Sequence, residues 1–532
     1  MPSLRQLPTT LQATKTLHPT TTPVVTADRA AGSFAGTDRF HVIDFHHVEF
    51  WCADAASTAG RVSFALGVPL AAHSDLTTGN TAHASHLLRS RSGPLAFLFT
   101  APYARHISAD DDAGATAAAS NSSPVVPSFS ADAARRFAAD YGLAVRAVAV
   151  RVSDAAEAFR ASVAAGARPA FSPAELGRGF VFAEVELYGD AVLRFVSYPA
   201  DTDVAFLPGF ESVVSSSECP DYGLNRFDHI VGGVPDLAPV AAYIAGFTGF
   251  HEFDRVNGDE IGTAESSLNG LVLANSSENV LLTLLEPVQG TKRRSQIQTF
   301  LDHHGGPGVQ HLAMTSDDLL GSLREIRARS SIGGFELLPP PPPSYYDSVR
   351  RLAGDVLSEA QIKECQELGV RVDRADSGGV VLQTFTKAAG DRPTLLLEFI
   401  QRIGCVEIDE NGKEYQRGGC GGFAKDNVIH LVKSIEDYDK TLDAPALDKM
   451  PGGRRTQTCN SLYARTTQDA EAEALARSRL ARRPRGRPRR AVQSNWELVS
   501  GGDHRQCNGI LDGLIRLHYP GLVTHAQVES PP

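Results

Sequence analysis

Short apolar runs recur along the chain at spacings that predict strands and helices. Residues 40–51 are rich in aromatic and β-branched side chains, which is typical of a strand. Residues 53–67 then carry apolar positions at helical spacing, and compact apolar runs at 86–88 and 95–99 indicate further strands. The opening part of the chain therefore predicts a strand, a helix and more strands, in that order.

The same order of elements returns along the rest of the chain. Opening strands are predicted at 144–150, 227–231 and 309–313, and each is followed by a helical pattern and a pair of apolar runs. The helix of the second repeat is expected over 154–165, with Ser153 as its N-cap. A repeated unit determines an architecture more strongly than any single element does. We therefore predict an α+β fold of four βαβββ-type modules, paired into two open, barrel-like domains.

Changes in composition along the chain suggest its division into parts. A Pro-Gly pair at 208–209 and a run of serines at 215–217 mark a linker between the two halves. The predicted parts are a flexible N-terminal lead at 1–38, an N-terminal domain at 39–200, a linker at 201–225, a C-terminal domain with a capping helix at 226–445, and an atypical Arg-rich, disordered tail at 446–532.

Length and charge narrow the possible classes of protein. A chain of 532 residues is too long for one ordinary core, so two or more domains are expected. The net charge of −11 argues against nucleic acid or an anionic membrane as the main partner. No apolar run reaches the roughly 18 residues that a membrane span needs, so we expect none.

The cysteines and the N-terminal segment give clues to the cellular compartment of the protein. The seven cysteines are scattered, odd in number and form no CxxC pair, which predicts free thiols in a reducing compartment. The first 27 residues contain no Asp or Glu, a feature of organelle transit peptides, but they carry few basic residues. A disordered tail on a cytoplasmic protein is therefore the favoured interpretation, and a plastid protein is the alternative.

Two histidines and one glutamate stand at matching places in the predicted C-terminal domain. His229 and His311 lie on the opening strands of their modules, and Glu398 lies on a closing strand. If two modules form one cup, these side chains can point into the same cavity. Two imidazoles and one carboxylate are the facial triad of non-haem Fe(II) oxygenases, which leaves metal positions open for substrate and O2. A strand histidine is more often structural, but the repeat symmetry favours a metal site.

The segments around these residues resemble a known family. RFDHIVG at 226–232, GGPGVQHLA at 305–313 and LEFIQRIGC at 397–405 are similar to the metal-ligand segments of 4-hydroxyphenylpyruvate dioxygenase, in its plant form. KRRSQIQTF at 292–300 and GCGGF at 419–423 resemble its pocket segments. The resemblance implies the vicinal oxygen chelate fold, a glyoxalase-like architecture.

The resemblance also implies an activity and a set of site residues. It implies that Fe(II), held by His229, His311 and Glu398, supports oxidative decarboxylation and ring hydroxylation of 4-hydroxyphenylpyruvate by O2. The products would be homogentisate and CO2, in tyrosine and phenylalanine catabolism, and the enzyme would be a homodimer. The residues expected to orient or surround the substrate are Gln296, Gln310, Gln383, Phe385, Phe423, Val231 and Asn427.

Departures from the family pattern gather in the expected substrate pocket. The family usually has Ser at Gly270, Pro at Thr283, Asn at Leu285 and Phe at Val428. Losing a polar partner leaves a substrate group unpaired, which costs about 1–3 kcal/mol. The alternatives are therefore a divergent relative with an altered product, as in hydroxymandelate synthase, or a weak or non-catalytic binding protein.

The tail has no counterpart in this family. The segment PRGRP at 484–488 is similar to the core of an AT-hook, which reads A·T-rich minor grooves. Arg-, Pro- and Gly-rich tails are common without such a function. We therefore do not expect nucleic acid as a partner.

Overall fold

The computed structural model describes most of the chain between Asp38 and Asp443. The described residues are 38–103, 125–200, 202, 206–214, 220–375, 378–408, 414–416, 419–422 and 424–443. Nearly all of the predicted lead, and the predicted tail with its PRGRP segment, lie outside them. Within the described ranges, no helix has both the length and the apolar character that crossing a membrane requires.

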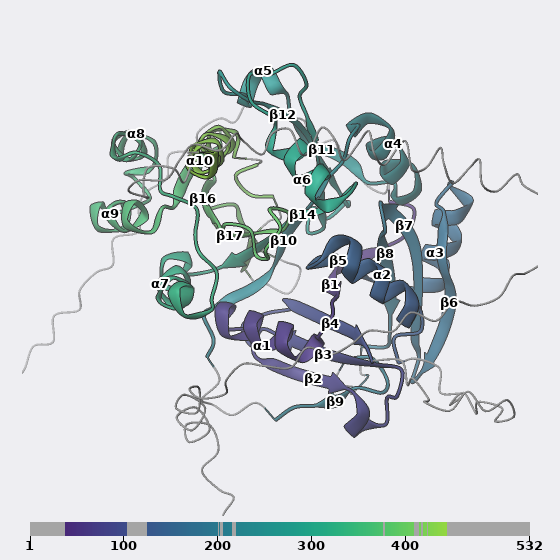
Figure 1. The fold of residues 1–532 in the computed structure, drawn as a ribbon. Helices are drawn as coiled ribbons and strands as arrows, with labels where there is room; N and C mark the ends of the chain where they lie inside the picture. The colour runs from purple at the N-terminus through teal and green to yellow at the C-terminus, as the bar shows by residue number, and fades with distance from the viewer. Residues whose placement is uncertain are drawn as a thin grey trace, which may run out of the picture. The chain divides into compact units, whose positions relative to one another are not determined.

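Four modules with the predicted order of strand, helix and three strands make up two sheets (Figure 1). The first module comprises β1 (Val42–Trp51), α1 (Ala55–Leu66), β2 (Leu70–Ser74), β3 (His83–Arg89) and β4 (Ala96–Pro102). The second comprises β5 (Ala144–Val152), α3 (Ala155–Ala164), β6 (Pro169–Gly177), β7 (Phe180–Tyr188) and β8 (Ala191–Ser197). The third comprises β10 (Leu224–Gly233), α4 (Leu237–Thr248), β11 (His251–Val256), β12 (Leu268–Ala274) and β13 (Leu281–Pro287). The fourth comprises β14 (Gly308–Ser316), α7 (Leu319–Arg329), β15 (Arg371–Arg374), β16 (Val380–Phe385) and β17 (Leu396–Ile403).

The two sheets repeat one topology. The first has the strand order β6-β7-β8-β5-β1-β4-β3-β2-β9, where β9 (Glu211–Ser212) is a short edge strand within the predicted linker. The second has the order β11-β12-β13-β10-β14-β17-β16-β15. In each sheet the opening strands of two modules pair antiparallel at the centre, and each pairs parallel with the closing strand of its own module. The opening strands therefore lie side by side, as the sequence predicted.

Several further elements surround these modules. They are α2 (Ala131–Tyr141), α5 (Gly258–Ile261), α6 (Gln296–His304), α8 (Pro343–Ala353), α9 (Glu359–Leu368), α10 (Lys425–Asp443), the short helices Leu76–Thr78 and Ser330–Ile332, and a two-stranded hairpin of β18 (Val406–Ile408) and β19 (Glu414–Gln416). Helix α10 packs against β15, α5 and α6, so it covers one part of the second sheet (Figure 1).

Alternation along the strands separates a hydrophobic core from a second, more polar face. On β17, Leu397 and Phe399 belong to the main core, whereas Glu398 and Ile400 point to the opposite side. The main core is continuous between the two halves, because the Phe227 ring of the second sheet lies 5.2 Å from the Phe97 ring of the first. The opposite face of the second sheet, which carries Glu398, lies outside this core and lines a cavity.

Two local predictions are wrong. Helix α3 is capped by Asp154 rather than Ser153, because the Asp154 carboxylate accepts a hydrogen bond from the Glu157 amide. Cys405 and Cys420 form a disulfide, although the sequence predicted only free thiols. Between these two cysteines the chain turns back through the β18–β19 hairpin, which brings them together.

Candidate metal centre

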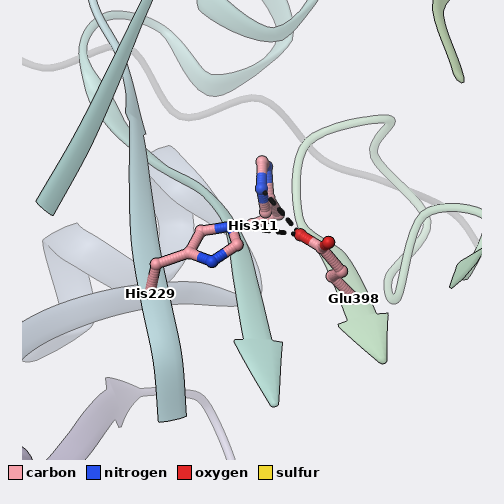
Figure 2. Close-up of side chains that lie close together, drawn as sticks. All are labelled: His229, His311 and Glu398. Atoms are coloured by element: carbon pink, nitrogen blue, oxygen red, sulfur yellow. Dashed lines mark ion pairs between the residues drawn. The ribbon is translucent and has the colours of Figure 1, made fainter. Parts of the chain in front are cut away.

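Three neighbouring strands carry the predicted ligands to one place. His229 lies opposite Ala313 in the β10–β14 pair, and Ala313 lies opposite Glu398 in the β14–β17 pair. His311, two residues before Ala313, points to the same face because side chains alternate along a strand. Figure 2 shows the three side chains converging from adjacent strands.

The distances between the three groups suit a single bound ion. One carboxylate oxygen of Glu398 lies 3.2 Å from Nε2 of His229 and 3.3 Å from Nε2 of His311, as the dashed lines in Figure 2 mark. The three ligand atoms lie within 4.8 Å of one another. Among the described residues this is the one group of three or more His, Cys, Asp and Glu with such spacing.

The second nitrogen of each imidazole is held by an acceptor. Nδ1 of His229 lies 2.8 Å from the carboxylate of Asp228, and Nδ1 of His311 contacts the side-chain oxygen of Gln310. Both contacting atoms are oxygens that accept, so each Nδ1 carries a proton and each Nε2 faces the site. Acceptors behind metal-bound histidines orient the ring in this way and raise its basicity. The donor set of two nitrogens and one carboxylate therefore fits a divalent transition metal.

The charges of these three side chains also fit a bound cation. Burial lowers the pKa of His229, but the charges of Glu398 and Asp228 outweigh it and raise this pKa to about 9. Burial raises the pKa of Glu398, but the two histidines outweigh it and lower this pKa to about 2. Burial lowers the pKa of His311. Without a metal ion, His229 is thus protonated, and its positive charge lies beside the carboxylate of Glu398.

A cavity with about 760 Å³ of empty space, partly open to solvent, adjoins the triad. Its walls come from the second sheet, α6 and α10, and most of them are apolar. They are formed by His229, Val231, Phe253, Leu268, Val272, Leu281, Thr283, Leu285, Gln296, Gln310, His311, Gln383, Phe385, Leu396, Glu398, Ile400, Arg402, Gly422, Ala424, Val428 and Leu431. An apolar chamber with a few convergent polar groups is the usual form of a small-molecule site.

Most of the predicted substrate residues lie on this cavity. Those on its wall are Val231, Gln296, Gln310, Gln383 and Phe385. The Phe385 ring packs edge-on against the His311 ring, with centroids 5.5 Å apart.

Of the two remaining predicted substrate residues, one lies behind the wall and the other is outside the described residues. Asn427 is buried behind the wall, where its side-chain nitrogen donates to Gln383 at 3.1 Å. It therefore orients a wall residue rather than forming the wall. Phe423 lies outside the described residues.

Sequence reasoning missed two buried residues next to the triad, Asp228 and Arg402. Asp228 adjoins His229, and Arg402 lies 174 positions along the chain from Asp228, yet the two form a salt bridge at 2.7 Å. Burial raises the pKa of Asp228, but Arg402 outweighs it and holds this pKa well below its usual range. The QRIGC segment contained Arg402, but nothing in the sequence paired it with Asp228.

Comparisons with known proteins show the family to which this chain belongs. Residues 228–344 match the Glyoxalase/Bleomycin resistance protein/Dioxygenase superfamily. The 4-hydroxyphenylpyruvate dioxygenase of Hordeum vulgare is 67% identical over 408 residues, which cover 77% of this chain and 90% of that protein. The chain belongs to the 4-hydroxyphenylpyruvate dioxygenase family. The protein of that name from Arabidopsis thaliana is 55% identical over 414 residues, or 91% of its length.

A solved structure confirms the predicted fold of this family member. A variant of 4-hydroxymandelate synthase from Streptomyces coelicolor matches 75% of this chain and 99% of its own length, with a TM-score of 0.58 and 24% identity. Together with the superfamily match, this likeness confirms the predicted vicinal oxygen chelate fold.

The first sheet of this family member has a counterpart of the triad that cannot bind metal in the same way. Its β1–β5–β8 register places His47, Ala147 and Arg194 where the second sheet has His229, His311 and Glu398. The buried Arg194 donates to Nε2 of His47 at 2.8 Å, so a guanidinium occupies the place of the carboxylate.

Proposed function

We propose that this chain catalyses the Fe(II)-dependent oxidative decarboxylation and ring hydroxylation of 4-hydroxyphenylpyruvate by O2. The products are homogentisate and CO2, so both oxygen atoms of O2 enter homogentisate as one carboxyl group of the substrate leaves. The observation that carries this proposal is the triad of His229, His311 and Glu398 on an apolar cavity, in a chain 67% identical to the Hordeum vulgare enzyme. The Fe(II) assignment rests on two imidazoles and one carboxylate, the ligand set of non-haem iron oxygenases.

The chain contributes binding, orientation and exclusion of water. His229, His311 and Glu398 would hold Fe(II) on one side and leave the other side to substrate and O2. The bound iron would supply the redox chemistry with O2. The apolar walls keep water away from the reacting centre, which prevents side reactions and strengthens polar contacts inside.

Three glutamines are suited to hold polar ends of the substrate. Gln310 touches the cavity while its oxygen holds His311, so it links substrate position to ligand orientation. Gln383 is fixed from behind by Asn427, which leaves its amide nitrogen for a substrate acceptor. Gln296 lies on the wall at the first position of α6. Phe385 offers its ring beside His311 as a wall for an aromatic substrate.

One pair of facing strand positions, of which Leu285 lines the cavity, favours an altered reaction as a second candidate. Gly270 and Leu285 lie opposite each other in the β12–β13 pair, where the family pattern has Ser and Asn. Their loss removes two polar partners from one side of the cavity. Without these two partners, the same substrate could bind with its benzylic carbon toward the metal site, and the product would be 4-hydroxymandelate.

Oxygen consumption with product analysis tests the proposal. Purified protein is given Fe(II) and 4-hydroxyphenylpyruvate under air, beside a His311→Ala variant that lacks one ligand. We expect the native protein alone to consume O2 and release homogentisate. Release of 4-hydroxymandelate would favour the second candidate, and absence of O2 uptake by iron-loaded protein would refute both.

The quaternary structure and the compartment belong to the same proposal. We infer a cytoplasmic homodimer with the segment division predicted from the sequence, including a catalytic domain at 226–445. Sedimentation of the full chain tests the dimer, and fractionation of cells expressing a tagged chain separates a cytoplasmic protein from a plastid protein.

A further inference from the structure

Arg402, near the end of β17, touches both the metal-binding strand and the segment before α10. Its Nε and Nη2 donate to the two carboxylate oxygens of Asp228, at 2.8 and 2.7 Å. Its Nη1 donates to the backbone carbonyls of Cys420 and Gly422, the latter at 3.1 Å. The side chain is buried, so these bonds are shielded from competing water.

Asp228 contacts both Arg402 and the candidate metal ligand His229. It is 1% exposed, and the same oxygen that accepts from Nη2 of Arg402 lies 2.8 Å from Nδ1 of His229. A carboxylate held by a two-pronged guanidinium has little freedom to turn. The orientation of the His229 ring therefore depends on where Arg402 lies.

The segment that Arg402 holds at its other end is a tight turn. Gly421 has a φ of 83°, and a Cβ there would come within 2.3 Å of the Val381 side chain. The turn leads into α10, where Val428 and Leu431 form part of the cavity wall. The turn therefore lies between Arg402 and the helix that forms this part of the wall.

We propose that Arg402 is a positioning residue that couples the orientation of His229 to the seating of the turn at 419–422. This inference rests on the proposed metal site. A bound metal would hold the His229 ring in place, and through Asp228 and Arg402 this would stabilise the contacts of the guanidinium with the two carbonyls of the turn. Coupling of this kind is reciprocal, so a seated turn also strengthens metal binding.

Hydrogen exchange of the native protein tests the coupling without any substitution. Exchange of the backbone amides at 419–422 is measured with and without Co(II), in the absence of substrate. We expect metal to slow this exchange by roughly tenfold, within the usual range of coupling between sites. Equal exchange with and without bound Co(II) would overturn the proposal.

The variant Arg402→Lys separates charge from geometry. A lysine keeps the positive charge near Asp228 but cannot span both carboxylate oxygens and the two carbonyls. We expect Co(II) affinity to fall by about 10- to 100-fold, as for other residues behind metal ligands. We also expect the metal-dependent protection of the turn to be lost and the Co(II) absorption spectrum to change.

Arg194→Lys is the matched control. Arg194 is also buried, in the first sheet, where it pairs with Glu49 and contacts His47, far from the triad in sequence. The group of metal-ligand spacing found among the described residues does not include these partners. We expect this variant to lose stability but to keep native Co(II) affinity. Native affinity in Arg402→Lys, or an equal loss in both variants, would overturn the proposal. Native protein that binds no metal at all would instead refute the proposed function.

Discussion

Arg371 on β15 is a buried cation whose hydrogen-bonding capacity is only partly used. Its Nη2 donates to the Ser434 hydroxyl at 2.6 Å, whereas its Nε and Nη1 have no partner among the described residues. The side chain has no exposed surface, and burial lowers its pKa. It lies opposite Gln383 in the β15–β16 pair and so faces the same side of the sheet. We predict that Arg371→Met stabilises the protein.

The expected change in the free energy of unfolding follows from the groups that lose or gain hydrogen-bond partners. Two unpaired buried nitrogens cost about 1–3 kcal/mol each, and the bond to Ser434 returns about 1.5–3 kcal/mol. Ser434 is not stranded by the change, because its hydroxyl also donates to the His430 carbonyl at 2.9 Å. Methionine fills the space of the long side chain with apolar atoms. A gain of about 1–4 kcal/mol is expected, as for other buried ions replaced by apolar groups.

Thermal unfolding of the metal-free protein measures the change. For domains of this size, 1 kcal/mol corresponds to about 2–4 °C, so the midpoint should rise by several degrees. Arg194→Met is the contrasting variant, because all three nitrogens of Arg194 have partners and its loss strands Glu49 and Glu184. Its midpoint should fall, by the equivalent of about 3–5 kcal/mol. A lower midpoint for Arg371→Met would show that the two unpaired nitrogens of Arg371 do not destabilise the fold.

Further predictions concern the triad and the cavity. Glu398→Gln should abolish measurable Fe(II) binding in calorimetry, because it removes the one negative ligand, and retained binding would contradict the ligand set. The raised pKa of His229, about 9, means that the stabilisation from its charged ring is complete below its ordinary pKa of 6.5 and is lost as the pH rises through 9. Because metal competes with that proton, binding at pH 7.5 should release about one proton per metal, measured in buffers of different ionisation enthalpy; no release would contradict this. The double variant Gly270→Ser, Leu285→Asn should lower the KM for 4-hydroxyphenylpyruvate by roughly 5- to 150-fold, and an unchanged KM would show that these positions do not touch the substrate.

The repeated apolar pattern predicted the modules, and their symmetry pointed to the three candidate metal ligands that the structure brings together. Central strands such as β1 and β17 are buried and rich in β-branched or aromatic residues, so their signal is strong. Edge strands were missed for the opposite reason. Strand β6 is largely exposed and contains two prolines, and it exists because it pairs with β7. Such pairing depends on the tertiary structure, so the local sequence of β6 does not predict the strand.

The supporting groups behind the triad also depended on tertiary structure. His229 and His311 could be found because each stands on an opening strand, but the salt bridge between Asp228 and Arg402 joins residues that only the folded sheet brings together. The disulfide between Cys405 and Cys420 depends likewise on the β18–β19 hairpin. Asn427, which the resemblance implied as a substrate residue, lies behind the cavity wall and donates to Gln383, a contact that local sequence does not show.

The most direct test of the central claim is a reaction under ¹⁸O2 with iron-loaded protein and 4-hydroxyphenylpyruvate, followed by mass spectrometry of the product. We expect homogentisate that carries both labelled oxygen atoms, one in the new ring hydroxyl and one in the carboxylate. We also expect His311→Ala to give no labelled product. Recovery of unlabelled substrate from native protein with bound iron would contradict the claim that this triad and cavity form a working dioxygenase site.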